Sequence, residues 1–301
     1  MRMNIGFIGL GTMGTVMCQR LLESGCDLTV WNRTQDVATP VIERGAKWGD
    51  SPMNVARVSN VVITMTSDDE ASNTVICGSN GILEGAHQDM IIIDSASISP
   101  EMARSNAAIA QEKGIDLLDA PVSGGPKVAA QGALGIMVGG SEKAFRVCEP
   151  ILKNLGKMVL YTGSSGNGVT LKLIANLIMG VAIQASAEAL VLAAKLGIDP
   201  QVVIDITSLP GTGPQTGAMA TRGPRMIEQN FFPPHFSANN MNKDLTGAIR
   251  LAEKVGVSLP TVSAAREVLR AVKSQGNGHI DSSAVVSILE SMANTSVSKE
   301  R

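Results

Sequence analysis

The strongest constraint on the fold of this chain is a glycine-rich segment that directly follows its first apolar run, Met3–Ile8. The segment is Gly9-Leu10-Gly11-Thr12-Met13-Gly14. Apolar residues then recur at helical spacing through the stretch Met13–Glu23. A strand, a G-x-G-x-x-G turn and an amphipathic helix in this order predict the first unit of a Rossmann-type domain that binds a dinucleotide.

Each glycine of the motif has its own expected role. Gly9 permits the tight turn, Gly11 lets the backbone approach a pyrophosphate, and Gly14 lets the helix pack closely on the strand. The helix N-terminus adds N–H groups and the positive end of its dipole. We therefore expect residues 9–14 to bind the phosphates of the cofactor.

The first half of the chain alternates short apolar runs with helix-like segments. Continuous apolar strands separated by helices predict a parallel sheet that is covered on both faces. The expected strands are Met3–Ile8, Leu28–Trp31, Val61–Met65, Met90–Asp94 and Ile115–Leu118, with Gly135–Val138 and Met158–Tyr161 as extra strands. We place this Rossmann domain at residues 1–162.

The second half, residues 163–301, predicts an all-α domain. Its longest helix is expected at Val169–Leu196, which has no proline and only Gly180 as an interior breaker. This segment is apolar on nearly every side, so it should be buried nearly all round, in part by a partner subunit of a homodimer or homotetramer. Further helices are expected at Pro200–Ser208, Asn240–Val255, Thr261–Gln275 and Ser282–Met292, and loops at Leu209–Pro214 and Asn230–Ser237.

Composition narrows the class of protein. Of 301 residues, 25 are basic and 27 acidic, and this balance removes the electrostatic case for binding nucleic acid. Four scattered cysteines favour reduced thiols of a cytoplasmic protein over a disulfide framework or a zinc site. The start of the chain does not resemble a signal peptide. The apolar run after Lys172 reaches Glu188 after 15 uncharged residues, fewer than the about 20 that a membrane span needs.

The end of the second expected strand indicates which nicotinamide cofactor binds. An NAD site normally carries a carboxylate about 20 residues after the glycines, on the ribose 2′-hydroxyl. This chain instead has Asn32, Arg33 and Thr34, and the guanidinium of Arg33 can pair with a 2′-phosphate. NADP(H) is therefore the preferred cofactor, with NAD(H) as the alternative.

Two further loops are expected beside the cofactor, because a dinucleotide lies across the carboxyl ends of the strands. One loop is Met65-Thr66-Ser67 and the other is Ser95-Ala96-Ser97. Their position in the predicted fold, more than their side chains, makes Met65, Thr66 and Ser97 candidates for cofactor contact.

Four blocks of sequence together resemble the 3-hydroxyisobutyrate dehydrogenase family, a branch of the β-hydroxyacid dehydrogenases. They are Gly6–Gly14, Asp119-Ala120-Pro121-Val122-Ser123-Gly124-Gly125, Lys172 with Asn176, and Lys243-Asp244. The resemblance covers nearly the whole chain. It implies a Rossmann domain, a helical C-terminal domain that contributes to a subunit interface, and NAD(P)-dependent interconversion of 3-hydroxy acids and their semialdehydes. The chain departs from the family at Ala96-Ser97 and Ala175-Asn176, which puts its substrate in question.

The residues of these blocks suit such chemistry. Ser123-Gly124-Gly125 offers a hydroxyl and unshielded backbone N–H groups to a substrate carboxylate. Burial of Lys172 on an apolar helix should lower its pKa and allow it to act as general acid or base. Asn176, one turn later, could orient the lysine or the substrate, and the resemblance places Lys243 against cofactor or substrate. The three histidines are His87, His235 and His279, which we expect at the surface.

The leading hypothesis is an NADP(H)-dependent oxidoreductase for a small carboxylate-bearing substrate. Candidates are 3-hydroxyisobutyrate, tartronate semialdehyde, succinic semialdehyde and glyoxylate. An imine reductase is disfavoured because such relatives generally replace the equivalent of Lys172. A 6-phosphogluconate-type decarboxylating enzyme needs a much longer C-terminal domain. A non-catalytic NADP(H)-binding sensor has no need to keep Lys172, Asn176 and Ser123-Gly124-Gly125 together.

Overall fold

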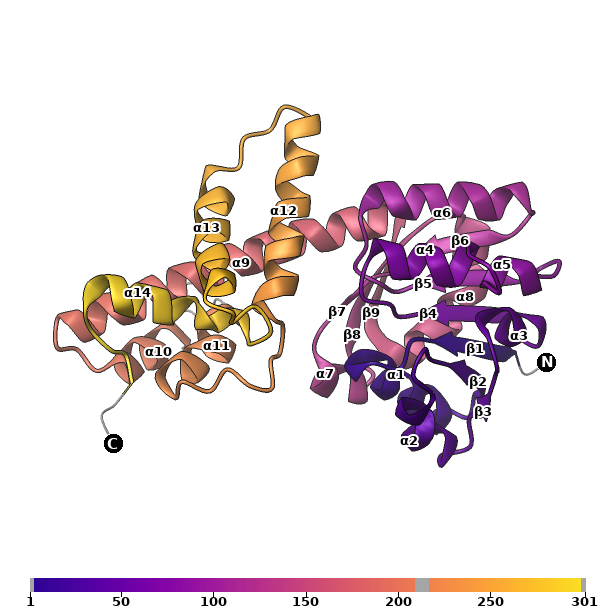
Figure 1. Ribbon diagram of the computed structural model, residues 1–301, viewed down its shortest axis with the longest axis horizontal. Coiled ribbons are helices and arrows are strands. Elements are labelled where there is room, and N and C mark those ends of the chain that lie inside the picture. Colours follow the sequence, from indigo (N-terminus) through magenta and orange to yellow (C-terminus); the bar gives the residue numbers. More distant parts are fainter. Residues whose placement is uncertain (1–2, 209–216, 299–301) are drawn as a thin grey trace. The chain divides into compact units, whose positions relative to one another are not determined.

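The chain forms an α/β unit followed by a helical unit (Figure 1). The computed structural model describes residues 3–208 and 217–298, so the predicted loop Leu209–Pro214 lies outside the described residues. The two compact units divide between Lys172 and Leu173. The predicted class, a Rossmann-type sheet followed by an all-α region, is confirmed.

The sheet of the first unit has the strand order β3-β2-β1-β4-β5-β6-β8-β7, and β9 pairs with β8. The strands are β1 (Asn4–Ile8), β2 (Asp27–Trp31), β3 (Lys47–Trp48), β4 (Val61–Thr64), β5 (Ile91–Asp94), β6 (Asp116–Asp119), β7 (Val122–Ser123), β8 (Leu134–Gly139) and β9 (Gly156–Gly163). Neighbouring strands in the part β3-β2-β1-β4-β5-β6 of the sheet run parallel. Strand β8 is antiparallel to β6 and to β7. Every predicted strand is present. The sequence pattern missed β3 and β7, because two residues are too few to show a period.

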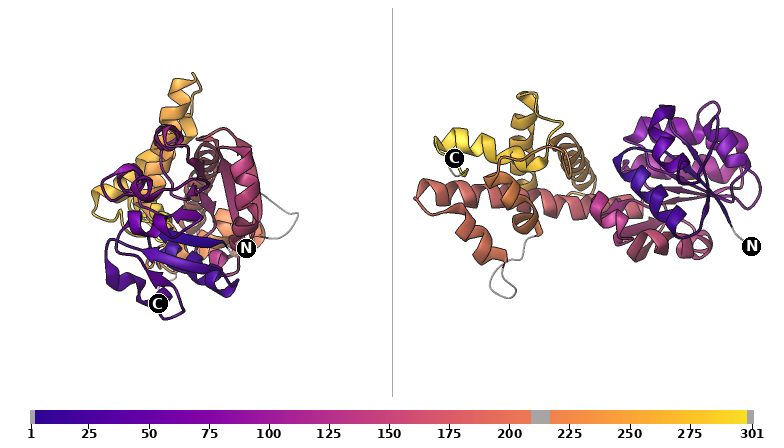
Figure 2. Two further views of the ribbon diagram at one scale, coloured as in Figure 1. Left: turned by 90° about the vertical axis from the view of Figure 1, so that its right-hand side faces the viewer. Right: turned by 90° about the horizontal axis from the view of Figure 1, so that it is seen from below.

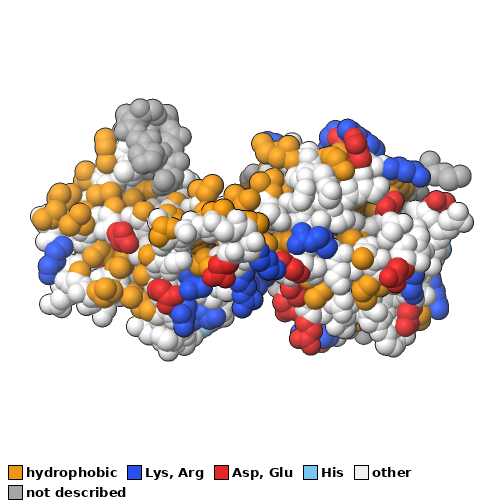
Figure 3. Space-filling view, turned by 90° about the horizontal axis from the view of Figure 1, so that it is seen from above, with side chains coloured by type: hydrophobic (Ala, Val, Ile, Leu, Met, Phe, Trp, Pro, Cys, Tyr) orange, Lys and Arg blue, Asp and Glu red, His pale blue; other side chains and the backbone are white. Residues whose placement is uncertain are grey.

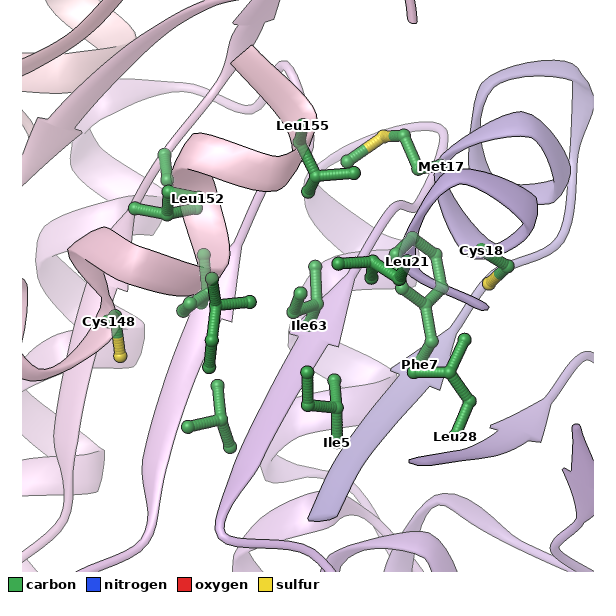
Figure 4. Packing of buried hydrophobic residues seen from close by; sticks show 14 of the residues in the cluster. Ile5, Phe7, Met17, Cys18, Leu21, Leu28, Ile63, Cys148, Leu152 and Leu155 are labelled. Carbon is green, nitrogen blue, oxygen red and sulfur yellow. The ribbon is translucent and has the colours of Figure 1, made fainter. Parts of the chain in front are cut away.

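Helices cover both faces of this sheet. They are α1 (Thr12–Glu23), η1 (Gln35–Ala38), α2 (Thr39–Ile42), α3 (Pro52–Arg57), α4 (Asp69–Cys77), α5 (Ile82–Gly85), α6 (Pro100–Glu112), α7 (Pro126–Ala130) and α8 (Glu142–Leu155). Figure 4 shows Phe7 and Ile63 of the sheet packed with Leu21 of α1 and Leu155 of α8. On the opposite face, side chains of α3 to α6 cover the alternate strand residues such as Val62 and Ile92. The sheet is thus buried on both sides, as its continuous apolar strands predict.

The second unit is built from helices. They are α9 (Asn167–Lys195, which begins in the first unit), α10 (Pro200–Ser208), α11 (Gly217–Ile227), α12 (Ala238–Lys254), α13 (Pro260–Ser274), η2 (Ser282–Ala284) and α14 (Val285–Ala293). Helices α12 and α13 run side by side (Figures 1 and 2). Gly180 lets α12 approach α9 closely, because a Cβ there would lie 2.9 Å from Leu245 Cδ2. The predicted helices are present, and α11 was missed because Gly223 and Pro224 lie inside it.

Helix α9 is buried on one side only within a single chain, so its predicted burial nearly all round would need the partner subunit that the prediction included. Leu171, Ile174, Ile178 and Leu192 are between 36% and 64% exposed. The other helices of the second unit cover one side of α9 and leave apolar side chains on the other. Figure 3 shows hydrophobic side chains gathered on the visible face of the helical unit. By length and hydropathy α9 is the one described helix that could cross a membrane, a test that core helices also pass.

Candidate functional site

The three glycines of the turn after β1 differ in what the protein itself requires of them. Gly9 has a φ of +97°, and a Cβ there would collide with the Met65 carbonyl. A Cβ at Gly14 would collide with the carbonyl oxygen of Gly9. Gly11 has an ordinary φ of −68°, and a Cβ there would meet no atom within 4 Å. Neither backbone strain nor packing explains a glycine at 11, whereas a pyrophosphate lying against the turn does.

The start of α1 points to the same ligand. In three other long helices of the sheet layers, the side chain of the preceding residue accepts a hydrogen bond from a backbone N–H of the first turn. These capping residues are Asp68 for α4, Ser99 for α6 and Ser141 for α8. The residue before helix α1 is Gly11, which has no side chain to accept such a bond. The first N–H groups of a helix need acceptors, and an anion at this end supplies them. The turn therefore fits the phosphates of a dinucleotide.

A hollow of about 440 Å³ adjoins this turn. It is lined by Leu10, Gly11, Thr12, Thr15, Val16, Asp36, Val37 and Pro40. Leu10, Gly11 and Thr12 of the glycine turn thus form part of the wall of this hollow. Asp36 was not predicted, because it comes after the position at the strand end where a ribose-binding carboxylate is expected. Arg33 is exposed and does not line this hollow.

Asn32 fixes the loop that carries Arg33. Its side-chain oxygen accepts the N–H of Leu10 at 2.9 Å, and its Nδ2 donates to the carbonyl of Thr34 at 2.9 Å. One side chain therefore ties the glycine turn to the end of β2. Arg33 lies between the two anchored residues, and Thr34 is exposed beside it. Asn32 acts here on the protein backbone, a role that the sequence pattern did not reveal.

The loop after β4 also borders the glycine turn. Met65 donates its N–H to the carbonyl of Ile8 at 2.8 Å. The next residue, Thr66, buries its Oγ1, which has no hydrogen-bond partner among the described residues. A buried hydroxyl without a partner is costly unless a ligand satisfies it. Thr66 thus agrees with a cofactor across the ends of β1 and β4, whereas Ser97 is half-buried beyond β5.

Polar side chains end three adjacent strands in register: Thr64 on β4, Asp94 on β5 and Asp119 on β6. Asp94 accepts hydrogen bonds from Thr64 Oγ1 at 2.8 Å, Ser72 Oγ at 2.5 Å and the Ala96 N–H at 3.1 Å. Burial raises the pKa of Asp94 although these donors oppose the shift. This network ties α4 and the 95–97 loop to the sheet.

Asp119 reaches the start of α9. Its Oδ1 accepts the N–H of Gly166 at 2.7 Å and its Oδ2 the N–H of Val169 at 3.0 Å. Burial raises the pKa of Asp119, and these two N–H groups oppose that effect. Lys172 follows Val169 by three residues and is 7% exposed. The predicted burial of the lysine near the start of the long helix is present.

Ser123-Gly124-Gly125 follows Asp119 on the same segment and spans the end of β7. Gly124 has a φ of +123° and is packed against Val128 and Leu134. The backbone conformation and the packing therefore both require a glycine at this position. Gly125 has a φ of −91°, and a Cβ there would meet no atom within 4 Å. Gly125 therefore resembles Gly11, because neither the backbone conformation nor the packing of the protein requires a glycine at either position. The half-buried Ser123 lies beside this open position.

In the second unit, Asn176 and Asp244 form a buried pair. Asn176 Nδ2 donates to Asp244 Oδ2 at 2.6 Å, and the two residues are 9% and 1% exposed. This bond joins α9 to α12 and fixes the orientation of the amide. Asp244 was not among the predicted site residues, since nothing in the sequence shows that α12 packs here. Lys243, its neighbour, is exposed on α12.

The remaining candidates for proton transfer or metal binding are less suited. His87, His235 and His279 are exposed, as predicted. His87 contacts the backbone carbonyls of Ser59 and Gln88. Within residues 3–208 and 217–298, no group of three or more His, Cys, Asp or Glu side chains could hold a metal ion.

Comparisons with known proteins agree with this geometry. Residues 4–163 match the family described as the NAD binding domain of 6-phosphogluconate dehydrogenase. Residues 166–289 match the family described as NAD-binding of NADP-dependent 3-hydroxyisobutyrate dehydrogenase. The two matched regions cover the Rossmann-type sheet and the helices that carry Lys172, Asn176 and Asp244.

Individual relatives match over nearly their whole length. Glyoxylate/succinic semialdehyde reductase 1 of Arabidopsis thaliana is 37% identical over 94% of this chain and 97% of its own. The 2-hydroxy-3-oxopropionate reductase of Escherichia coli is 35% identical over 97% and 99%. A crystal structure of 3-hydroxyisobutyrate dehydrogenase from Salmonella typhimurium superimposes with a TM-score of 0.86 at 28% identity, covering 95% of this chain and 99% of that one. The chain therefore belongs to the 3-hydroxyisobutyrate dehydrogenase family and is an NAD(P)-dependent β-hydroxyacid dehydrogenase.

Proposed function

We propose that this enzyme uses NADP(H) to interconvert a small 3-hydroxy acid and its semialdehyde, with Lys172 as the general acid and base. The observation that carries the proposal is the buried lysine in the first turns of α9, tied by Asp119 to the segment that bears Ser123-Gly124-Gly125. A nicotinamide bound on this unit supplies or accepts the hydride.

Residues of this chain transfer the proton and hold the substrate. Lys172 donates a proton to the carbonyl oxygen during reduction and removes the hydroxyl proton during oxidation. Ser123 and the backbone at Gly125 hold the substrate carboxylate, because the missing side chain at Gly125 leaves room for a ligand against the main chain. Asn176, held by Asp244, keeps its amide in one orientation along α9. These roles require a substrate that carries a carboxylate within a few carbon atoms of its reacting carbon.

The names of the relatives favour short aldehyde-acids, since one reduces glyoxylate and succinic semialdehyde and another 2-hydroxy-3-oxopropionate. The direct test mixes the purified protein with NADPH and each of these acids and follows the loss of nicotinamide absorbance. We expect turnover of at least one of them. NADPH binding without turnover of any aldehyde-acid contradicts the proposal and supports a sensor, and turnover of cyclic imines alone supports an imine reductase.

Replacement of Arg33 by alanine should selectively weaken NADPH. Arg33 is exposed on a loop fixed by Asn32 and makes no hydrogen bond or ion pair with any other described residue. Loss of a charge-assisted bond to the 2′-phosphate should cost about 1.5–3 kcal/mol of NADPH binding and leave NADH binding unchanged. Fluorescence titration with both cofactors measures this.

The matched control is Arg44→Ala, which removes an exposed arginine whose Nη1 lies 3.6 Å from Glu23 Oε1. It should leave both affinities unchanged. Equal affinity of the unmodified protein for NADPH and NADH contradicts the assignment. Tighter binding of NADH instead points to Asp36, the carboxylate in the hollow beside the glycine turn.

We also propose that the enzyme is a symmetric homo-oligomer. Several apolar side chains on and next to α9 and α10 are left in solvent in a single chain, as is typical of a subunit interface. They are Ile178 and Leu192 on α9, Leu196 directly after it, and Val202 and Ile206 on α10, each more than 50% exposed. Sedimentation at micromolar concentration should give a multiple of 31.3 kDa, and a stable monomer contradicts the proposal.

A charge on this surface gives a sharper test of assembly. Leu192→Glu should shift the protein toward monomer, because a carboxylate cannot be buried unpaired in an apolar interface. Val58→Glu is the matched control, since Val58 is 52% exposed but lies on the first unit. It should leave the sedimentation coefficient unchanged.

A further inference from the structure

Asp119 differs from the other side chains that cap helices in the first unit. For α4, α6 and α8 the capping residue immediately precedes the helix: Asp68, Ser99 and Ser141. Asp119 is instead the last residue of β6, and it caps α9 by binding two N–H groups that lie 47 and 50 residues later in the sequence. The cap of α9 is therefore a tertiary link between the sheet and the helix.

The surroundings of Asp119 are shaped for this link. A Cβ at Gly139 would lie 2.6 Å from Asp119 Oδ1, and a Cβ at Gly168 would lie 2.9 Å from its Oδ2. Gly166 adopts a φ of +87°, which favours glycine, and its N–H points to Oδ1. Glycines at three positions thus let the carboxylate and the first turn of α9 approach each other.

The two bonds use N–H groups that the helix itself leaves unpaired. The intrahelical series begins with the Thr170 N–H, which donates to the Gly166 carbonyl at 3.1 Å. The N–H groups of Gly166 and Val169 precede it and donate to Asp119. Val169 is also packed against Ala96 and Ile98 of the loop after β5. The first turn of α9 is therefore held on two sides.

Asp119 also leads directly into the segment that carries Ser123-Gly124-Gly125. The Asp119 side chain thus connects two parts of the chain. One is the end of β6, which precedes the proposed substrate-binding segment, and the other is the first turn of α9, which precedes Lys172. We propose that Asp119 is a positioning residue that sets the place of Lys172 relative to the bound substrate, an inference that rests on the proposed function. Asp94, its neighbour in register, has no such link, because its partners are Thr64, Ser72 and Ala96.

Asp119→Asn is the variant that tests this role. The amide keeps the size of the side chain, but its NH₂ group faces one of the two N–H donors, so one bond is lost. We expect kcat to fall about 10- to 100-fold, since small displacements of a catalytic group have effects of this order. The Kd of NADPH should stay within about two-fold, because the glycine turn follows β1 and two strands, β4 and β5, separate β1 from β6 in the sheet. Hydrogen exchange of the amides of residues 166–172 should become faster.

Ser141→Ala is the matched control. It removes the side-chain cap of α8, where Ser141 Oγ accepts the Ala144 N–H at 3.3 Å, and lowers the melting temperature without touching α9. It should leave kcat and the exchange of residues 166–172 unchanged. A fall in kcat equal to that of Asp119→Asn means that loss of stability alone explains the effect, and overturns the inference.

The double variant Asp119→Asn with Lys172→Ala separates positioning from a general structural role. If Asp119 acts through Lys172, the double variant should have the kcat of Lys172→Ala within about two-fold. If the fold-losses of kcat in the two single variants multiply in the double variant, Asp119 does not act through Lys172, and the inference is overturned. If Asp119→Asn does not fold, Asp119→Ser is the second variant, because its smaller side chain fits the space of Asp119 and leaves at least one of the N–H groups of Gly166 and Val169 without its acceptor, and the same cycle applies.

The exchange measurement keeps this inference distinct from the proposed function. If the unmodified enzyme turns over none of the aldehyde-acids, the proposed function fails, whatever the variants do. Unchanged exchange of residues 166–172 in Asp119→Asn shows that Asp119 does not hold the helix. That result overturns the inference while leaving the proposed function intact.

Discussion

Replacement of Lys172 by alanine should lower kcat by about 10²–10⁴-fold, the usual contribution of a positioned proton donor. Lys172 is 7% exposed near the start of an apolar helix, so water cannot readily replace it as the acid. NADPH binding should persist, because the glycine turn and the Thr66 loop belong to other parts of the sheet edge. Steady-state kinetics with the best aldehyde-acid, beside a cofactor titration, measure both quantities.

Two further variants separate proton transfer from simple packing. Lys172→Arg should recover little activity, since a guanidinium remains charged and does not release its proton. Lys195→Ala, at the other end of α9, removes a lysine that donates to the Ala293 carbonyl at 2.8 Å and should leave kcat unchanged. Near-normal turnover by the arginine variant means that the proton comes from another group, and the proposed role of Lys172 fails.

The same substitution at two glycines of one turn should have opposite consequences. Gly14→Ala places a methyl group against the Gly9 carbonyl and forces α1 away from β1. Overpacking of this kind costs about 1–3 kcal/mol of unfolding free energy. Gly11→Ala meets no atom within 4 Å and keeps an ordinary φ, so its stability should match that of the unmodified protein.

The cofactor affinities should rank in the reverse order of the stabilities. The methyl group of Gly11→Ala occupies the approach to the pyrophosphate and should weaken NADPH by about 1.5–3 kcal/mol through lost bonds to charged phosphate. Denaturant unfolding and NADPH titration of both variants provide the comparison. Unchanged NADPH affinity in Gly11→Ala contradicts the placement of the phosphates at this turn.

Local sequence patterns determined the architecture of the first unit. Apolar runs such as Val61–Met65 have no polar face, so they need cover on both sides, and a parallel sheet between helices provides it. The glycine turn was readable because its spacing follows from backbone sterics within a few residues. Lys172 stood out for the same local reason, as a cation within an apolar helix.

Tertiary structure decided which distant groups meet, because pairing across tens of residues leaves no local signature. The bonds from Asp119 to α9 and from Asn176 to Asp244 each depend on how elements far apart in sequence pack. The same holds for the unpartnered Thr66 hydroxyl and for Asp36 in the hollow. The exposed side of α9 is the clearest case: the sequence shows that the helix is apolar all round, but only the packed chain shows which side its own helices leave uncovered.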